Sequence, residues 1–368
     1  MTQGITNTFL CLSLLLSLAT ANAFQSDADK AVAWWEIPRA APFDASELKQ
    51  RPIIRVDGNR FVDEQGNTFL FKGMNIAAPD RLLKIGQWNK GLFEELKEWG
   101  VNTIRLPIHP IGWRMMGQAE YAKVLDEAVV WANDLDIYLI IDWHSIGYLP
   151  SGLFQHPMYE TDEQETLQFW QFISARYEGV PTVAVYEIFN EPTDIGGKAG
   201  KASWPVWKAF NEKVIDVIHA HDKDVISLVA GFDWAYDLRP VLADPVAREN
   251  VAYVSHPYPQ KERPNPRNKD TLYPLWDRKF GHVASTYPII VTELGWVSPD
   301  GYGAHIPVKD NGSYGPMIVD YMHQRGISWT GWVFDPQWSP VMITDWNYTP
   351  SEQGEFFKRV LQGDYEPK

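Results

Sequence analysis

The chain has 368 residues, of which 45% are hydrophobic and 22% are charged, a composition typical of a globular protein and unlike that of disordered or collagen-like chains. Its formal net charge of −14 argues against nucleic acid or an anionic membrane surface as a partner and favours a neutral or cationic ligand. The 17 Trp, 16 Tyr and 17 Phe residues are more than a core needs, and aromatic rings suit the apolar faces of sugars.

A short apolar segment opens the chain. Residues 1–23 contain no Asp, Glu, Lys or Arg, and the Leu-rich run Phe9–Ala19 is followed by Ala21-Asn22-Ala23, which resembles a cleavage site. The run is shorter than the ~20 residues that span a bilayer. We expect a secretory signal peptide over residues 1–23, cleaved near Ala23, and export to the periplasm or the medium; a buried N-terminal helix is the alternative. If cleavage follows Ala23, the one cysteine, Cys11, leaves with this segment, and thiol chemistry is excluded in the mature protein.

Two features precede the main body of the chain. Residues 24–50, with Trp34-Trp35 and several prolines, are expected to form an extension that lies on the domain. Residues 54–69 alternate apolar and polar side chains around Asp57-Gly58 and Gln65-Gly66, a pattern that predicts a β-hairpin. No low-complexity linker follows, so residues 51–368 are expected to form a single domain.

Apolar, β-branched runs then alternate with helical patterns. The eight predicted strands are Phe69–Ile76, Thr103–Pro107, Ile137–Trp143, Val183–Phe189, Val225–Ala230, Val251–His256, Ile289–Glu293 and Ser328–Phe334. The spacing of Tyr121, Leu125, Ala128, Ala132 and Leu135 places them on one face of a helix, and residues 208–219 and 316–325 behave similarly. Strands that read as continuous apolar runs indicate a buried parallel sheet. Eight such units predict a closed (β/α)8 (TIM) barrel, and no Gly-rich phosphate-binding motif supports a nucleotide fold.

Polar residues end most of these predicted strands. In a (β/α)8 barrel the chemistry lies where strands end and βα loops begin, so these residues are the candidates for a site. They are Arg105, Asp142, His144, Asn190, Glu191, His256, Tyr258, Glu293 and Trp332. We expect Asp142 to brace the end of the third strand.

Two carboxylates, Glu191 and Glu293, each follow a hydrophobic run directly. An acid held there is partly desolvated, which costs several kcal/mol unless it is paired. A structural ion pair is the alternative, but the Arg, His and Asn residues on neighbouring strand ends favour catalysis. Such a pair suits glycoside hydrolysis. Arg105 and the Tyr258 hydroxyl would keep Glu293 ionised as the nucleophile, and Glu191 beside it would stay protonated as the acid.

From about Phe69 to Phe334 the chain resembles glycoside hydrolase family 5, part of a clan of retaining (β/α)8 glycosidases. The resemblance implies that Glu191, in Asn190-Glu191-Pro192, is the acid/base and that Glu293 is the nucleophile. It gives supporting roles to Arg105, His144, Asn190, His256 and Tyr258, and makes Trp332 the floor under the sugar. It also implies retention through a covalent glycosyl-enzyme, with no metal and no cofactor.

The substrate is the open question, because the resemblance covers enzymes that act on cellulose, mannan, xyloglucan and lichenan. An endo-β-1,4-glucanase is the leading hypothesis, on the frequency of that activity among secreted bacterial members; a β-mannanase, xyloglucanase or other β-glycanase is the alternative. A non-catalytic glycan-binding barrel is a third hypothesis. A metal-dependent hydrolase using Asp142, His144 and His256 is a fourth, but no H-x-H or H-E-x-x-H pair supports it.

Partners and sugar platforms complete the expectations. We expect a monomer that binds a polysaccharide or oligosaccharide, no nucleic acid and, after signal cleavage, no membrane. Six tryptophans fall in predicted βα loops, where each either floors a sugar subsite or packs in the core: Trp88, Trp113, Trp143, Trp234, Trp296 and Trp338.

Overall fold

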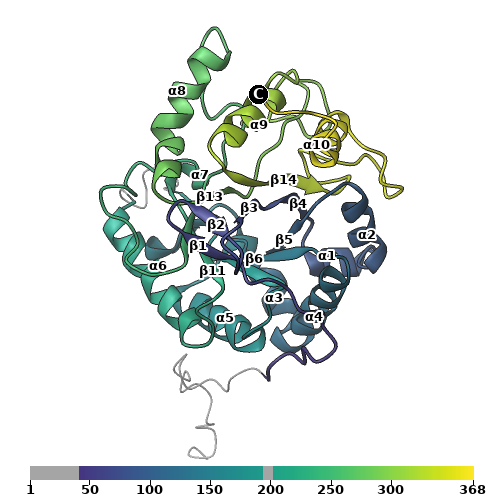
Figure 1. The fold of residues 1–368 in the computed structure, drawn as a ribbon, viewed down its shortest axis with the longest axis vertical. Coiled ribbons are helices and arrows are strands. Elements are labelled where there is room, and N and C mark those ends of the chain that lie inside the picture. Colours follow the sequence, from purple (N-terminus) through teal and green to yellow (C-terminus); the bar gives the residue numbers. More distant parts are fainter. Residues whose placement is uncertain (1–40, 194–201) are drawn as a thin grey trace, which may run out of the picture. The chain divides into compact units, whose positions relative to one another are not determined.

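The computed structural model describes residues 41–193 and 202–368 (Figure 1). The expected signal peptide at 1–23 and most of the expected extension at 24–50 lie outside these residues.

Eight parallel strands close into a barrel, which confirms the predicted fold class (Figure 1). In chain order they are β4 (Lys72–Ile76), β5 (Thr103–Ile108), β6 (Tyr138–Trp143), β9 (Val183–Glu187), β11 (Ile226–Ala230), β12 (Val251–Val254), β13 (Ile289–Val291) and β14 (Ser328–Phe334). The barrel closes where β14 pairs with β4, with Trp329 opposite Lys72. All eight strands are buried along their length, apart from the half-buried Lys72 at the start of β4, which is why they read as continuous apolar runs.

Helices surround the barrel and connect its strands (Figure 1). They are α1 (Pro79–Lys84), α2 (Lys90–Glu98), α3 (Pro110–Met116), α4 (Gln118–Asp134), α5 (Glu163–Arg176), α6 (Trp204–His219), α7 (Phe232–Ala235), α8 (Lys269–Lys279), α9 (Tyr314–Gln324) and α10 (Glu352–Gln362), with short 3-10 turns η2 (Leu149–Ser151), η3 (Pro157–Tyr159) and η4 (Gly281–Ser285). Helix α4 buries Tyr121, Leu125, Ala128 and Ala132, the face that the spacing predicts. In the stretches that the structure describes, none of these helices combines the length and the apolarity needed to cross a bilayer.

A small antiparallel sheet lies against the residues that open the barrel strands. It contains β1 (Arg55–Asp57), β2 (Arg60–Val62) and β3 (Thr68–Phe69), so the predicted hairpin has a third strand and the predicted first barrel strand begins at Lys72 rather than Phe69. Phe61 of β2 packs edge-on against Phe71, 5.1 Å between ring centres, in a core that includes the first residues of β6 and β11. Because this end is filled with apolar side chains, the opposite end of the barrel is left for chemistry.

A second small sheet lies in the loops that follow β6 and β9. It pairs β10 (Glu191–Pro192) with β7 (Ile146–Tyr148), and β7 with β8 (Leu153–Phe154). Glu191 lies opposite Ile146, and its backbone N–H donates to the Ser145 carbonyl at 3.0 Å. The sequence reasoning did not foresee this sheet, yet it fixes the backbone that carries Glu191.

Candidate active site

The polar ends of the barrel strands meet in a cleft of about 590 Å³. Six of the eight expected site residues line it: His144, Asn190, Glu191, Tyr258, Glu293 and Trp332. The other two, Arg105 and His256, are fully buried and hydrogen-bonded to residues of the cleft wall. The structure therefore brings together the eight side chains with expected catalytic or supporting roles, and the ninth strand-end candidate, Asp142, contacts His144.

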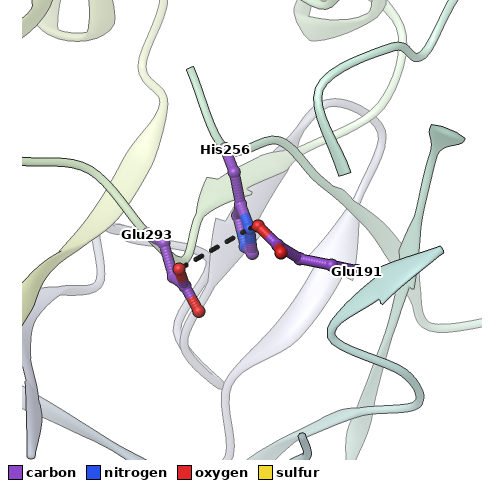
Figure 2. Close-up of side chains that lie close together, drawn as sticks. All are labelled: Glu191, His256 and Glu293. Atoms are coloured by element: carbon purple, nitrogen blue, oxygen red, sulfur yellow. Dashed lines mark hydrogen bonds and ion pairs between the residues drawn. The ribbon is translucent and has the colours of Figure 1, made fainter. Parts of the chain in front are cut away.

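Glu191 is buried in this cleft with one side of its carboxyl against His256 (Figure 2). Its Oε1 lies 2.9 Å from Nδ1 of His256. Burial raises the pKa of Glu191 to about 7, although the positive charges of Lys261 and Arg105 oppose the shift. A carboxyl with a pKa in this range is protonated often enough near neutral pH to serve as an acid.

Glu293 follows the end of β13 by two residues and faces the same cleft. Its Oε1 accepts a 3.1 Å hydrogen bond from Nη1 of Arg105, and its Oε2 accepts a 2.9 Å hydrogen bond from the Tyr258 hydroxyl. Burial raises the pKa of Glu293 to about 7, opposed by His256, by Arg105 and by the Tyr258 hydrogen bond. The two donors are the contacts that the charged form of a carboxylate needs.

The two carboxyls lie close together (Figure 2). One oxygen of Glu191, one oxygen of Glu293 and a ring nitrogen of His256 are all within 4.8 Å of one another. Carboxyls about 5–5.5 Å apart are typical of retaining glycosidases, whereas inverting enzymes hold them ~6.5–9.5 Å apart to admit a water. The observed spacing suits direct attack on a sugar carbon.

Arg105 is the centre of a buried polar network beneath the cleft. It donates two hydrogen bonds to Glu187, at 2.7 and 2.9 Å, and one each to Asn75 and Asn190, at 2.8 and 2.7 Å. Burial alone would lower the pKa of Arg105, but neighbouring carboxylates, with Glu187 among them, raise it, so the guanidinium stays charged. Sequence reasoning missed Glu187, the last residue of β9; its signal was a lone acid inside an otherwise apolar strand.

His144 and Trp332 form one wall of the cleft. Nδ1 of His144 lies 2.6 Å from Oδ2 of Asp142, so Asp142 holds this ring as well as contacting Arg105 at 3.0 Å. The rings of His144 and Trp332 are nearly parallel, 5.4 Å apart at an angle of 10°. The indole of Trp332 thus has a fixed orientation at the cleft, as a platform for a sugar ring requires.

A family model described as cellulase (glycosyl hydrolase family 5) matches residues 62–337. The chain belongs to glycosyl hydrolase family 5. This family 5 chain is 59% identical to a β-glucanase from Saccharophagus degradans solved in complex with cellotetraose; the match covers 90% of this chain and 99% of that one, with a TM-score of 0.88.

Curated relatives of this family 5 enzyme are more distant. Endoglucanase A from Butyrivibrio fibrisolvens is 28% identical over 264 residues, which cover 70% of this chain and 55% of that protein. The major extracellular endoglucanase of Xanthomonas campestris is 23% identical over 336 residues, covering 77% of this chain and 68% of that protein. The family 5 chain thus spans a little over half the length of the first of these relatives.

The loop tryptophans of this family 5 enzyme divide into core residues and cleft residues. Trp88, Trp113, Trp143 and Trp296 are buried and pack against neighbouring aromatic rings. Trp234 lines the cleft with 36% of its surface exposed, and its Nε1 donates to Oε1 of Gln155 at 2.8 Å. Trp338 is half-buried, with its ring stacked 6.2 Å from that of Trp332. Of the six, Trp234 is the strongest candidate for a second sugar platform.

Proposed function

We propose that this family 5 enzyme is a retaining endo-β-1,4-glucanase in which Glu293 is the nucleophile and Glu191 the acid/base. The observation that carries the proposal is the pair itself. Two buried carboxyls lie within 4.8 Å in one cleft, and Glu293 alone of the two accepts hydrogen bonds from both Arg105 and Tyr258. These donors favour the ionised form at Glu293, and the resulting negative charge favours the protonated form at Glu191.

In the first step, a carboxylate oxygen of Glu293 forms a bond to the anomeric carbon of the sugar. The bond from that carbon to the glycosidic oxygen breaks, and the proton of Glu191 moves to the departing oxygen. The shortened glucan leaves with a new hydroxyl, and an ester joins the remaining sugar to Glu293. Glu191 is then ionised.

In the second step, Glu191 takes a proton from a water molecule whose oxygen attacks the anomeric carbon. The ester bond to Glu293 breaks, Glu293 becomes a carboxylate again, and Glu191 again carries its proton. Two inversions at one carbon give net retention. Both residues return to their starting protonation states.

Other residues of the cleft are assigned to binding. Oδ1 of Asn190 accepts from Arg105, while its Nδ2 is buried with no hydrogen-bond partner among residues 41–193 and 202–368. A buried donor without a partner lowers the stability of the fold, so we assign Nδ2 of Asn190 to a hydrogen bond with a sugar hydroxyl. This hydrogen bond strengthens as the transition state forms. Trp332 is assigned to the sugar face and His144, held by Asp142, to a neighbouring hydroxyl.

The relatives support glucan as the substrate. The Saccharophagus protein is named a β-glucanase and was solved with cellotetraose, a β-1,4-linked glucose chain, and the other two are named endoglucanases. A β-mannanase, a xyloglucanase or another β-glycanase would share the same two carboxylates. Hydrolysis of carboxymethyl cellulose, barley glucan, glucomannan, xyloglucan and xylan by the purified enzyme decides among them. Fastest hydrolysis of a glucan with a rapid fall in viscosity supports the proposal; preference for glucomannan or xylan contradicts it.

Variants test the two catalytic roles. Glu191→Gln and Glu293→Gln should each lower kcat/KM on glucan by at least about 100-fold, whereas the exposed Glu120→Gln should not. The Glu191 variant should retain its first step on an aryl cellobioside with a good leaving group, because that group needs no proton. Near wild-type hydrolysis by either folded variant would refute the assignment.

The two remaining hypotheses have their own outcomes. A non-catalytic glycan-binding barrel would bind glucan without turnover on any of these substrates. The metal hypothesis named Asp142, His144 and His256, but the structure joins Asp142 directly to His144 and joins His256 to Glu191. Activity that survives dialysis against EDTA is expected, and loss restored by a divalent ion would favour the metal hypothesis.

We also propose that the enzyme acts outside the cell as a monomer, with residues 51–368 as its catalytic domain. The support is the apolar leader at residues 1–23, outside the described residues, and a relative whose name includes the word extracellular. Sequencing the N-terminus of the exported protein tests the first part, and a new N-terminus near Phe24 is expected. Sedimentation tests the second.

A further inference from the structure

A chain of hydrogen bonds links Arg105 to Glu191 through three buried side chains. Oγ1 of Thr292 donates a hydrogen bond to Oε1 of Glu187 at 3.0 Å. Oγ1 of Thr292 also lies 2.9 Å from Nε2 of His256. On the other side of the ring, Nδ1 of His256 lies 2.9 Å from Oε1 of Glu191. Glu187, Thr292 and His256 are all fully buried. The mechanism above uses neither Thr292 nor Glu187.

The direction of this chain is fixed at its Glu187 end. Burial raises the pKa of Glu187, and the Arg105 charge opposes that shift. Because both oxygens of Glu187 accept from Arg105, Oε2 from Nε and Oε1 from Nη2, the geometry fits a carboxylate that can only accept. The hydroxyl of Thr292 has one proton, and that proton points to Glu187. The oxygen of Thr292 can therefore only accept from His256, which places the ring proton on Nε2.

The remaining nitrogen of the ring then decides the state of Glu191. Burial lowers the pKa of His256 to about 4, so near neutral pH the ring is uncharged and carries one proton. With that proton on Nε2, Nδ1 offers a lone pair. Nδ1 of His256 lies 2.9 Å from Oε1 of Glu191. A protonated Glu191 can donate a hydrogen bond to the Nδ1 lone pair, whereas an ionised Glu191 is repelled by it, so the contact favours the protonated carboxyl.

We propose that Thr292 and Glu187 are positioning residues that hold His256 in its Nε2–H tautomer, so that Nδ1 accepts the proton of Glu191 and keeps that residue a neutral acid. This inference rests on the proposed role of Glu191 as acid/base. Thr292 and Glu187 would then contribute without touching the sugar or the reacting atoms. The protonation of Glu191 would depend on the hydroxyl of Thr292.

Other titratable groups lie near Glu191 and His256, and the test requires that their positions and charges do not differ between variants. Those acting on Glu191 or His256 are Arg105, Glu187, Asp233, Lys261 and Glu293. Four further groups are affected by the charge of Glu191 or His256: Asp142, His144, Tyr159 and Tyr258. Lys261 is held by the Asp233 carbonyl at 2.6 Å, and Glu293 by Arg105 and Tyr258. The contacts of Lys261 and Glu293 do not involve the Thr292 hydroxyl and stay in place when it is removed. Glu187 loses the hydrogen bond from this hydroxyl, but its two hydrogen bonds from Arg105 hold it in position.

The test removes the hydroxyl with little change in shape, as Thr292→Val. Without its acceptor at Nε2, the ring is free to take the Nδ1–H tautomer, which donates to ionised Glu191. The alkaline limb of kcat/KM against pH, where Glu191 loses its proton, should then move about one unit to lower pH. The acid limb, which reports Glu293, should not move with it.

Two matched variants separate this effect from a loss of packing. Thr292→Ser keeps the hydroxyl and should keep the wild-type alkaline limb. Thr330→Val removes an equally buried hydroxyl from β14 that donates to the Thr292 carbonyl rather than to its side chain, and should also keep it. An unmoved limb in folded Thr292→Val, or an equal shift in Thr330→Val, would overturn the proposal.

The tautomer can be read without any variant of Thr292. In the wild-type enzyme labelled with ¹⁵N-histidine, the ring signals of His256, assigned from their loss in His256→Gln, should show a proton on Nε2 and a bare Nδ1. A proton on Nδ1 would overturn the proposal even if Thr292→Val does not fold. If Glu191→Gln proves fully active, the proposed function fails instead, and the measured tautomer still stands as a separate result.

Discussion

Arg105 binds Glu187 through two hydrogen bonds, at 2.7 and 2.9 Å, inside the barrel where both side chains are fully buried. Its contact with Glu293 is a single hydrogen bond of 3.1 Å. Asp142 lies 3.0 Å from Nη2 of Arg105, so Asp142 and Glu187 together balance most of the charge of Arg105, and Glu293 receives a weaker share. The proposed nucleophile is therefore held less tightly than Glu187, which leaves more of its negative charge available for the proposed attack on the sugar.

This pairing predicts a large effect of Glu187→Gln on stability. The change puts a neutral amide in place of the one carboxylate that binds Arg105 through two hydrogen bonds and leaves Asp142 and Glu293 beside the buried charge, so the free energy of unfolding should fall by up to about 3–5 kcal/mol. Urea unfolding at neutral pH measures it. Glu163→Gln is the matched control, because the Glu163–Lys213 ion pair is half exposed and should contribute less than about 1 kcal/mol. Equal losses in the two variants would show that Arg105 does not depend on Glu187.

The raised pKa of Glu191 predicts a stability cost that appears only at higher pH. A carboxyl whose pKa is about 7 when folded and near 4.5 when unfolded binds its proton more tightly in the folded state. Its contribution to stability is complete below pH 4.5 and is lost as the pH rises through 7. Glu191→Gln, which cannot ionise, should therefore raise the free energy of unfolding at pH 8 by on the order of 1–3 kcal/mol.

Measurements at two pH values separate this effect from better packing. Urea unfolding of the wild type and Glu191→Gln at pH 4 should give nearly the same free energy, because Glu191 is protonated in both folded and unfolded states there. A gain at pH 4 as large as the gain at pH 8 would mean that the charge of Glu191 is not its cause.

We expect Tyr258 to set the position of the acid limb of activity. Its hydrogen bond lowers the pKa of Glu293, so Tyr258→Phe should raise that pKa, and the acid limb of kcat/KM should move to higher pH. Tyr121→Phe removes another buried hydroxyl, one that donates to Asp80 on the outer helices, and should leave the limb in place. Profiles measured from pH 4 to 9 check both variants. An acid limb unmoved in Tyr258→Phe would separate this hydroxyl from the ionisation of Glu293.

The strand ends were readable from sequence because a strand buried on both faces leaves its polar residues at its end. Glu191 and Glu293 lie just beyond apolar runs, and barrel topology alone places those strand ends together. Arg105 is the exception, because it lies inside β5. Their partners were not readable in the same way. Glu187 ends β9 and Thr292 directly follows β13, but their contact joins residues 105 positions apart in the chain, and it depends on strand register and on closure of the barrel.

The alternation of apolar and polar residues also failed to predict in full the two short sheets outside the barrel. The sequence predicts strand pairing at residues 54–69 but not the third strand, since Thr68 and Phe69 have the same apolar pattern as the barrel strand that follows. The β10–β7–β8 sheet is two to three residues per strand, too short for any periodicity. Burial of the loop tryptophans depends on which helix covers each one, which the sequence does not show.

Trp234 and Trp296 provide a direct test of which loop tryptophans contact the sugar. Trp234 faces the cleft, so Trp234→Ala should raise KM for long glucans about 2- to 10-fold, the loss of one stacking contact of about 0.5–1.5 kcal/mol, with a small change in stability. Trp296 is buried against Phe356 and Phe357, so Trp296→Ala should instead lower the free energy of unfolding by about 3–5 kcal/mol.

Trp234→Ala should therefore change KM more than stability, and Trp296→Ala should change the free energy of unfolding in urea. The length of the substrate gives a further check. Shorter cello-oligosaccharides that do not reach Trp234 should be cleaved by Trp234→Ala with the wild-type KM, because the indole lies beside Gln155 and Lys261 rather than beside the two carboxyls. A KM unchanged for every chain length would show that the exposed face of Trp234 does not contact the sugar. The next candidate for a sugar-stacking residue would then be Trp338, whose ring stacks beside that of Trp332.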